Sequence, residues 1–218
     1  MSTISASFSD YFAEATTLLA NAQEQPEIAT ALGTFGYDPP VLQAGQALLD
    51  TARDLHDRQI KEYGEQHAAT QAILKASKQA DKSYTTYRRL AKVAFKNDPQ
   101  RKTNLHLNQH KPQVFNPWYE QARHFYSALL ADPEAQTQLA RFNISLAALQ
   151  ASQAQLEQVY TLKNTQEREK GEAQDATQQR NAALGDLDEW LSDLRVVARI
   201  ALQDTPQLLE ALNFRAIP

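Results

Sequence analysis

The sequence contains no cysteine among its 218 residues, which excludes disulfide bonds, thiolate metal sites and cysteine nucleophiles. Glycine is also scarce, with 6 residues, and valine and isoleucine are sparse. Alanine, glutamine, leucine and glutamate dominate instead. Because these residues favour helices over strands, the composition predicts an all-α protein.

Long apolar runs and a basic charge balance are missing as well. No window of about 18 residues is apolar enough for a transmembrane helix, and the start MSTISASFSDYF lacks the features of a signal peptide. The net charge of -4 and the pI near 5.7 argue against nucleic acid as a partner. We therefore expect a soluble, cytoplasmic protein.

What the sequence does contain is an internal repeat. When the chain is shifted by 107 positions against itself, LQAGQALL in the first half falls on LQASQAQL in the second. The same offset pairs Gly64 with Gly171 and extends over nearly the whole chain. One constant offset predicts a tandem duplication, with copy one at 1–107 and copy two at 108–218 in one intertwined structural unit.

Each copy is expected to begin with two short helices. Ser9 and Asn116 are the candidate N-caps of the first helix in copies one and two, and Pro117 would follow at the first helical position. Asp132 is the candidate cap of the short helix at Pro133, and Thr205 together with Pro206 is expected to cap the last short helix. A polar residue followed by proline marks four such helix starts, at Pro26, Pro99, Pro133 and Pro206. A leucine that should be buried stands six positions after each proline, at Leu32, Leu105, Leu139 and Leu212.

A helical stretch without an internal proline dominates each copy, over about residues 40–97 and 145–204. An apolar stripe with a period of about 3.5 residues runs through both, as in a coiled-coil seam. Its residues are Leu42, Leu49, Ala52, Tyr63, Tyr84, Tyr87, Ala91 and Ala94, and Leu149, Leu156, Val159, Leu184, Leu187, Leu191, Leu194, Ala198 and Ala201. The middle of the stripe is polar, with His56, Gln59, Gln66 and Thr70 in copy one, and Lys163, Gln166, Lys170 and Thr177 in copy two.

Two folds fit this pattern. In the first, each stretch is one helix of ~58 residues, and the two pack antiparallel about a pseudo-twofold axis as a coiled coil. Small helical bundles would then form at each end. In the second, Gly64 and Gly171 end helices, and the chain forms a compact eight-helix array with hairpins at these glycines. The unbroken phase of the stripe favours the first fold.

Titratable residues offer few candidate sites. His106 and His110 have a metal-ligand spacing, but they lie between helices without a carboxylate partner, so linker positions explain them more simply. Glu120 and His124 share a helix face, where an ordinary surface pair is at least as good an explanation. Glutamates of the polar middle could gather into a cation-binding or proton-binding group, although a solvated charged face is the simpler interpretation; they are Glu62, Glu65, Glu169 and Glu172.

Aromatic residues are expected to cluster where the long helices end, at Tyr84, Tyr87, Trp118, Tyr119, Phe125 and Trp190. Core packing explains them, and a ligand pocket between helices is the alternative. The segment TTYRRLAKVAFK is basic and amphipathic, like a membrane-surface or partner helix, but the helix dipole explains cations near a helix end. The sequence has no phosphate loop, no nucleophile elbow and no zinc motif. We therefore assign no catalytic, cofactor-binding or metal-ligating residue and expect no cofactor.

The C-terminal segment LDEWLSDLRVVARIALQDTPQLLEALNF, residues 187–214, resembles a group of uncharacterised bacterial helical proteins. These end on D-x-W-x-S-D-F-x-x-x-A-R-I-A-L followed by P-Q-L-L-E-x-L-G. The matching residues are Asp188, Trp190, Ser192, Asp193, Ala198, Arg199, Ile200, Ala201, Leu202, Pro206, Gln207, Leu208, Leu209, Glu210 and Leu212. Leu194 replaces phenylalanine, and Asn213 replaces glycine. The resemblance implies a bacterial, all-helical protein and implies no activity.

These observations favour a non-catalytic structural or protein-interaction protein. It would present its long helices to a protein partner or to a second copy, because a seam with polar positions commonly pairs with another helix. A small-ligand or metal-binding helical bundle is the alternative, with its site at an aromatic end or among the central glutamates. An enzyme with an unrecognised site is a third hypothesis, which the missing motifs disfavour.

Overall fold

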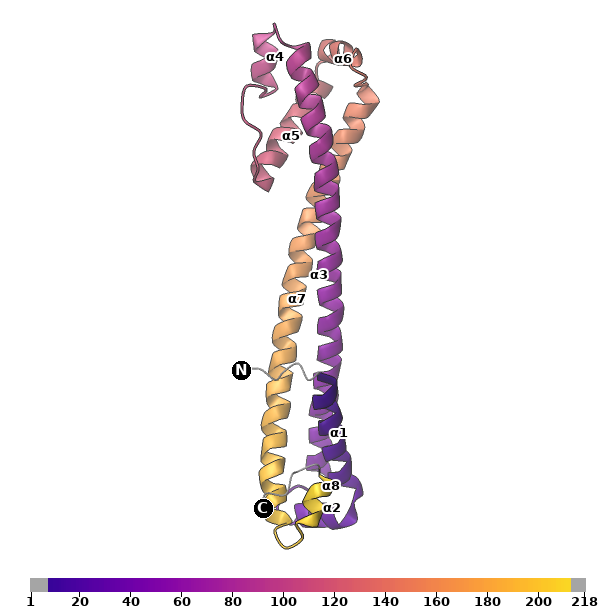
Figure 1. The fold of residues 1–218 in the computed structure, drawn as a ribbon, viewed down its shortest axis with the longest axis vertical. Coiled ribbons are helices and arrows are strands. Elements are labelled where there is room, and N and C mark those ends of the chain that lie inside the picture. Colours follow the sequence, from indigo (N-terminus) through magenta and orange to yellow (C-terminus); the bar gives the residue numbers. More distant parts are fainter. Residues whose placement is uncertain (1–7, 213–218) are drawn as a thin grey trace. The chain divides into compact units, whose positions relative to one another are not determined.

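The computed structural model of the protein describes residues 8–212. Within this range the chain forms eight helices and no strand, which confirms the all-α prediction (Figure 1). The helices are α1 (Phe8–Glu24), α2 (Pro26–Gly33), α3 (Pro39–Ala94), α4 (Pro99–Asn104), α5 (Phe115–Leu130), α6 (Pro133–Ala140), α7 (Leu146–Ala201) and α8 (Gln207–Ala211).

The two long helices, α3 and α7, are continuous. Each contains 56 residues, and Gly64 and Gly171 lie inside them as ordinary helical positions. The alternative fold with hairpins at these glycines is therefore wrong. A glycine costs a helix only about 1 kcal/mol relative to alanine, and the many alanine, leucine and glutamine residues around it offset that cost.

The chain divides into two compact units, and each unit contains parts of both long helices. Unit 1 comprises Met1–Tyr63 and Glu172–Pro218, so the start of α3 packs with the end of α7. Unit 2 comprises Gly64–Gly171, so the end of α3 packs with the start of α7. The long helices consequently run antiparallel within each unit, as predicted.

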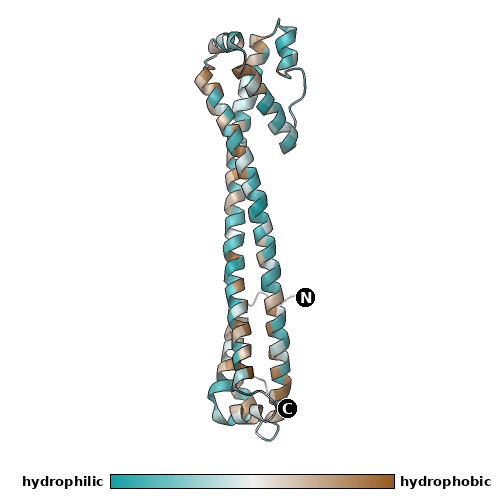
Figure 2. Cartoon of the chain, turned by 180° about the vertical axis from the view of Figure 1, so that it is seen from behind, coloured by the Kyte–Doolittle hydropathy of each residue, from teal (hydrophilic) through white to brown (hydrophobic). Residues whose placement is uncertain are grey.

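The core of unit 1 forms where α1, α2 and α8 cover the two long helices. Leu208 and Leu209 of α8 pack against this core, and Leu212 is buried in it. The main buried residues of the unit 1 core are Phe12, Leu18, Leu19, Ile28, Leu32, Leu42, Leu49, Leu187, Leu191 and Leu194. Figure 2 shows many hydrophilic residues elsewhere along both long helices. Most residues of the predicted apolar stripe are buried or packed against a core. Tyr63 is the exception, because its side chain is 62% exposed, so its assignment to the stripe was wrong.

The core of unit 2 is richer in aromatic residues. It forms between α5, α6 and the two long helices, and it includes the side chains of Leu105 and Leu107 between α4 and α5. Its largest fully buried side chains include Tyr84, Phe95, Phe125 and Tyr126. The four leucines predicted to follow the helix-starting prolines are all buried in one core or the other, with Leu32 and Leu212 in unit 1 and Leu105 and Leu139 in unit 2.

Proline determines where several short helices begin. Helices α2, α4 and α6 each start at a proline, as predicted. The Asp132 carboxylate accepts a hydrogen bond of 2.9 Å from the Ala135 amide and caps α6, and Asp98 accepts an equivalent 2.9 Å bond from the Arg101 amide in α4. These bonds satisfy amides that have no partner inside the helix.

Three predicted N-caps are wrong. Helix α5 begins at Phe115 after an extended Val114, so Asn116 lies inside its first turn. Ser9 lies inside α1. The N-cap of α8 is Pro206, as expected for one of its two predicted cap residues, and Thr205 is not the cap. The first turn of a helix tolerates proline because its amides have no helical partner, so Pro117 does not fix the start of α5.

Candidate functional site

A groove of about 340 Å³ lies in unit 2, between α3, α5 and the segment that joins α4 to α5. Its walls combine aromatic and aliphatic groups with two lysines and one aspartate. The lining residues are Leu74, Ser77, Lys78 and Asp81 of α3, Lys111, Pro112 and Gln113 of the joining segment, and Phe115 and Trp118 of α5. This combination of a mainly apolar wall and a few polar groups is typical of small-ligand sites.

Asp81 holds the three sides of the groove together. One carboxylate oxygen, Oδ1, accepts hydrogen bonds from Lys111 Nζ at 2.6 Å and from Trp118 Nε1 at 2.8 Å. The other oxygen, Oδ2, accepts from Lys111 Nζ at 2.7 Å, and Nζ also donates to Thr85 Oγ1 at 3.1 Å. Lys111 thus has oxygen partners for all of its N–H donors, and its charge is compensated by Asp81.

A buried polar network behind the groove fixes the joining segment. The Tyr84 hydroxyl donates to Gln121 Oε1 at 2.8 Å, and Gln121 Nε2 donates to the His110 carbonyl at 3.2 Å. Burial raises the pKa of Tyr84 to about 12, so the hydroxyl keeps its proton at neutral pH. Arg88 donates to the His106 carbonyl at 3.1 Å and to the Gln109 carbonyl. These bonds satisfy backbone carbonyls that no regular helix satisfies.

The histidines with a metal-like spacing do not form a site with each other. His106 has a positive φ of 51° and stacks on His124 with a centroid separation of 4.3 Å. Burial, and to a smaller extent His124, lower the pKa of His106 and favour its neutral form. His110 contributes its backbone carbonyl to the network described above.

The predicted surface pair of Glu120 and His124 does not form either. Glu120 instead pairs with Arg123 at 2.8 Å, and His124 Nε2 lies 2.7 Å from the Asn104 carbonyl. His124 therefore joins the end of α4 to α5. Within residues 8–212, no group of potential metal ligands includes a histidine.

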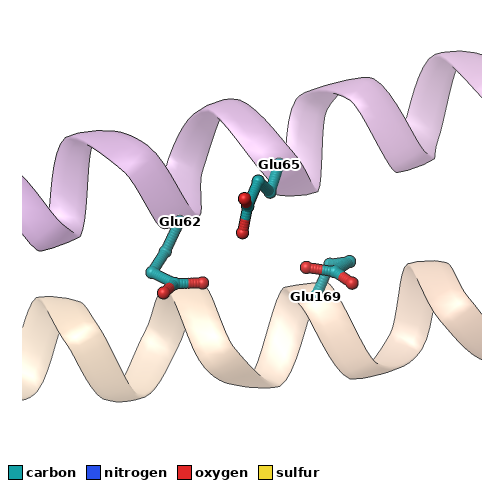
Figure 3. Close-up of side chains that lie close together, drawn as sticks. All are labelled: Glu62, Glu65 and Glu169. Carbon is teal, nitrogen blue, oxygen red and sulfur yellow. The ribbon is translucent and has the colours of Figure 1, made fainter.

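The central glutamates lie where the seam is polar. Glu65 of α3 and Glu169 of α7 belong to unit 2, and their carboxylate oxygens lie within 4.8 Å of each other. Figure 3 shows both side chains, with Glu62 one turn earlier on α3. Glu169 is only 9% exposed and Lys170 is exposed, so Glu169, and not Lys170 as predicted, lies in the seam. The Glu169 carboxylate accepts a 2.6 Å hydrogen bond from Arg168. A carboxylate compensated by arginine is an ordinary feature of a charged helix pair.

The aromatic residues expected where the long helices end are divided between the two units. Tyr84 packs edge-on against Phe125 in unit 2, with 5.4 Å between ring centroids. Trp190 lies in unit 1, where it packs edge-on against Tyr37 at 5.7 Å. The antiparallel course of α7 explains the split, because its C-terminal part belongs to the other unit from α5.

A second polar cluster, without apolar walls, links α4 to α6. Arg101 donates to Asp98 at 2.9 Å, to Asp132 at 2.8 Å and to Glu134 at 2.8 Å. All three acceptors carry negative charge, so the pKa of the Arg101 guanidinium is raised, chiefly by the bonds to Asp132 and Glu134. The charge of Arg101 is fully compensated, and the three carboxylates leave a negative excess that partial exposure to water can screen. The bonds of Arg101 to both helices indicate a structural role.

Replacing Asp132 with alanine should lower the free energy of unfolding by about 1 kcal/mol at pH 7, because it removes the N-cap of α6. The hydrogen bond from Arg101 holds the pKa of Asp132 below its ordinary value. Between the lowered pKa and the ordinary one, the unfolded chain binds more protons, so this stabilisation is lost as the pH falls through that window.

The difference between the wild type and Asp132→Ala should therefore shrink below about pH 4. Urea denaturation at pH 7 and at about pH 3 measures it. A difference that stays constant or grows at low pH would contradict this assignment.

Comparison with known protein families, with curated proteins and with solved structures finds no match. The resemblance of residues 187–214 to bacterial helical proteins thus stays a prediction. Across residues 8–212, no helix is both long and apolar enough to span a membrane.

Proposed function

We propose that this chain is a non-catalytic helical protein that associates with a second copy of itself through an exposed face of α3. The observation that carries the proposal is the exposure of two large apolar side chains in unit 1. Ile60 is 56% exposed and Tyr63 is 62% exposed. Residues three apart lie on the same side of a helix, so these two side chains form one apolar patch, here called the Ile60–Tyr63 face.

A second copy is the occupant that suits this face best. The segment of α3 from Asp57 to Glu65 carries charges of both signs, so the same segment of an antiparallel copy can be complementary to it. Twofold dimers are the commonest oligomers, and they use one patch on both chains. The net charge of -4 over 218 residues opposes association only weakly.

The proposal also retains the tandem duplication, the coiled-coil pairing of the long helices and a bacterial, cytoplasmic setting. Helix lengths support the duplication. They are 17, 8, 56 and 6 residues in α1 to α4 and 16, 8, 56 and 5 residues in α5 to α8. A duplicated helical framework whose described residues match no catalytic motif fits a structural role better than an enzymatic one.

Substituting both Ile60→Ser and Tyr63→Ser should weaken self-association at least about tenfold, because the pair removes the apolar area that association would bury. Sedimentation velocity over about 5 to about 200 μM measures the monomer–dimer equilibrium. The matched control replaces Val196 and Ile200 with serine. These side chains are 52% and 50% exposed, and they lie one turn apart on α7 in the same unit.

Circular dichroism should give the same helix content for both double variants and the wild type. A wild-type chain that is monomeric over the whole range overturns the proposal. Equal weakening by the control pair also overturns it, because association would then not depend on the Ile60–Tyr63 face.

A further inference from the structure

The charges that line the groove of unit 2 do not cancel. Asp81 and Lys111 form an ion pair with 2.6 Å between nitrogen and oxygen, and they compensate each other. Lys78 also lines the groove, and its side-chain ammonium makes no ion pair or hydrogen bond within residues 8–212. The groove therefore carries one uncompensated positive charge, which favours an anion.

The groove is also lined by two aromatic side chains of α5, Phe115 and Trp118. Phe115 stacks on Tyr119 with an interplanar angle of 11°, which holds its ring in place, and its centroid lies 5.9 Å from that of Trp118. The Trp118 indole is fixed in turn by its hydrogen bond to Asp81. Leu74 lies one turn before Lys78 on α3, lines the groove and is 59% exposed, so it adds an aliphatic surface that a ligand can cover.

The groove is prearranged and small. Its joining-segment wall is held by the bonds to Asp81 and by the buried network of Tyr84 and Gln121, so little conformational entropy would be lost on binding. A volume of about 340 Å³ lies at the lower end of the range typical of small-ligand sites. It suits a single ring or a short aliphatic chain.

We infer that this groove binds a small amphipathic carboxylate, a monoanion whose apolar body rests on Phe115, Trp118 and Leu74 while its carboxylate pairs with Lys78. Ser77 and Gln113 line the same groove and add a hydroxyl and an amide that can donate to the carboxylate. This inference goes beyond the proposed association, because it uses neither Ile60 nor Tyr63.

Three probes with the same body and different head groups test the inference: phenylpropionate, phenylpropanol and phenylpropylamine. Binding is measured on the full chain by two-dimensional NMR of the tryptophan indole N–H groups. Phenylpropionate should shift the Trp118 signal and leave that of Trp190, which does not line the groove, unchanged. It should bind about fivefold more tightly than the alcohol, which is near the upper limit for an exposed ion pair, and the amine should bind most weakly.

Lys78→Gln should remove the preference for the acid over the alcohol. The control is Lys92→Gln, which removes the same charge about 21 Å further along α3, beyond the screening length at physiological salt. It should leave the preference unchanged. The inference is overturned if the amine binds as tightly as the acid, if no probe shifts Trp118 at millimolar concentration, or if Lys78→Gln keeps the full preference.

Discussion

Replacing Phe125 with alanine should lower the free energy of unfolding by about 4 kcal/mol, the cost expected for removing a large aromatic side chain from a packed core. Phe125 is 0% exposed and lies in the centre of the unit 2 core. Its ring packs edge-on against Tyr84 and against Tyr126, each at 5.4 Å between centroids. Such pairs add about 0.5–1.5 kcal/mol beyond the burial of apolar area.

The same substitution at Phe35 is the matched control. Phe35 is 51% exposed in the turn after α2, so Phe35→Ala should change the free energy of unfolding by less than about 0.5 kcal/mol. Urea denaturation followed by circular dichroism measures both variants. Similar losses for the two variants would mean that Phe125 does not occupy the buried position described.

The continuity of the long helices was predictable from the sequence, whereas the exact face that each helix buries was not. The apolar stripe keeps its phase on both sides of Gly64, and α3 is helical through that residue. However, a heptad register does not say which element covers a given position. Tyr63 and Tyr84 share one register, yet Tyr63 is 62% exposed, whereas Tyr84 is buried against Phe125 of α5.

The short helices show a similar division. Proline followed by an acidic or amide residue correctly predicted where α2, α4 and α6 begin, because the fixed φ of proline suits the first helical turn. At α8 the same pattern is displaced by one residue, because Pro206 is the N-cap and the helix begins at Gln207. The separate prediction that Asn116 caps α5 was wrong, since the extended Val114 precedes that helix. A side-chain oxygen can cap a helix only if its residue lies just outside it, and the sequence alone did not fix that boundary.

The groove could not be predicted, because its residues come from three separate segments. Trp118 was expected in a core, with a ligand pocket between helices as the alternative. Its hydrogen bond to Asp81 of α3 depends on how α5 folds back on α3. Lys111 lies in an irregular segment without periodicity, and its position depends on the bonds that Tyr84, Arg88 and Gln121 make behind it. Patterns of periodic burial report helix faces and give no information on the path of such a segment.

Replacing Gly45 with leucine should lower the free energy of unfolding by about 3 kcal/mol, at the upper end of the usual cost of overpacking a core. Gly45 lies in α3, and the indole of Trp190 from α7 packs directly on it, so even a Cβ atom would overlap the ring. Trp190 cannot move freely, because its ring also packs edge-on against Tyr37. The helices must therefore separate, or the indole must leave its place against Gly45.

Gly185→Leu provides the control, because a side chain at Gly185 in α7 would meet no neighbouring atom. Leucine is a better helix former than glycine, so this variant should gain up to about 0.8 kcal/mol. The two substitutions are chemically identical and both lie in long helices of unit 1, so opposite signs in urea denaturation isolate the contact with Trp190. A red shift of tryptophan fluorescence in Gly45→Leu alone would show that the indole has moved into water, whereas a stabilising effect at both glycines would refute the close contact between α3 and α7.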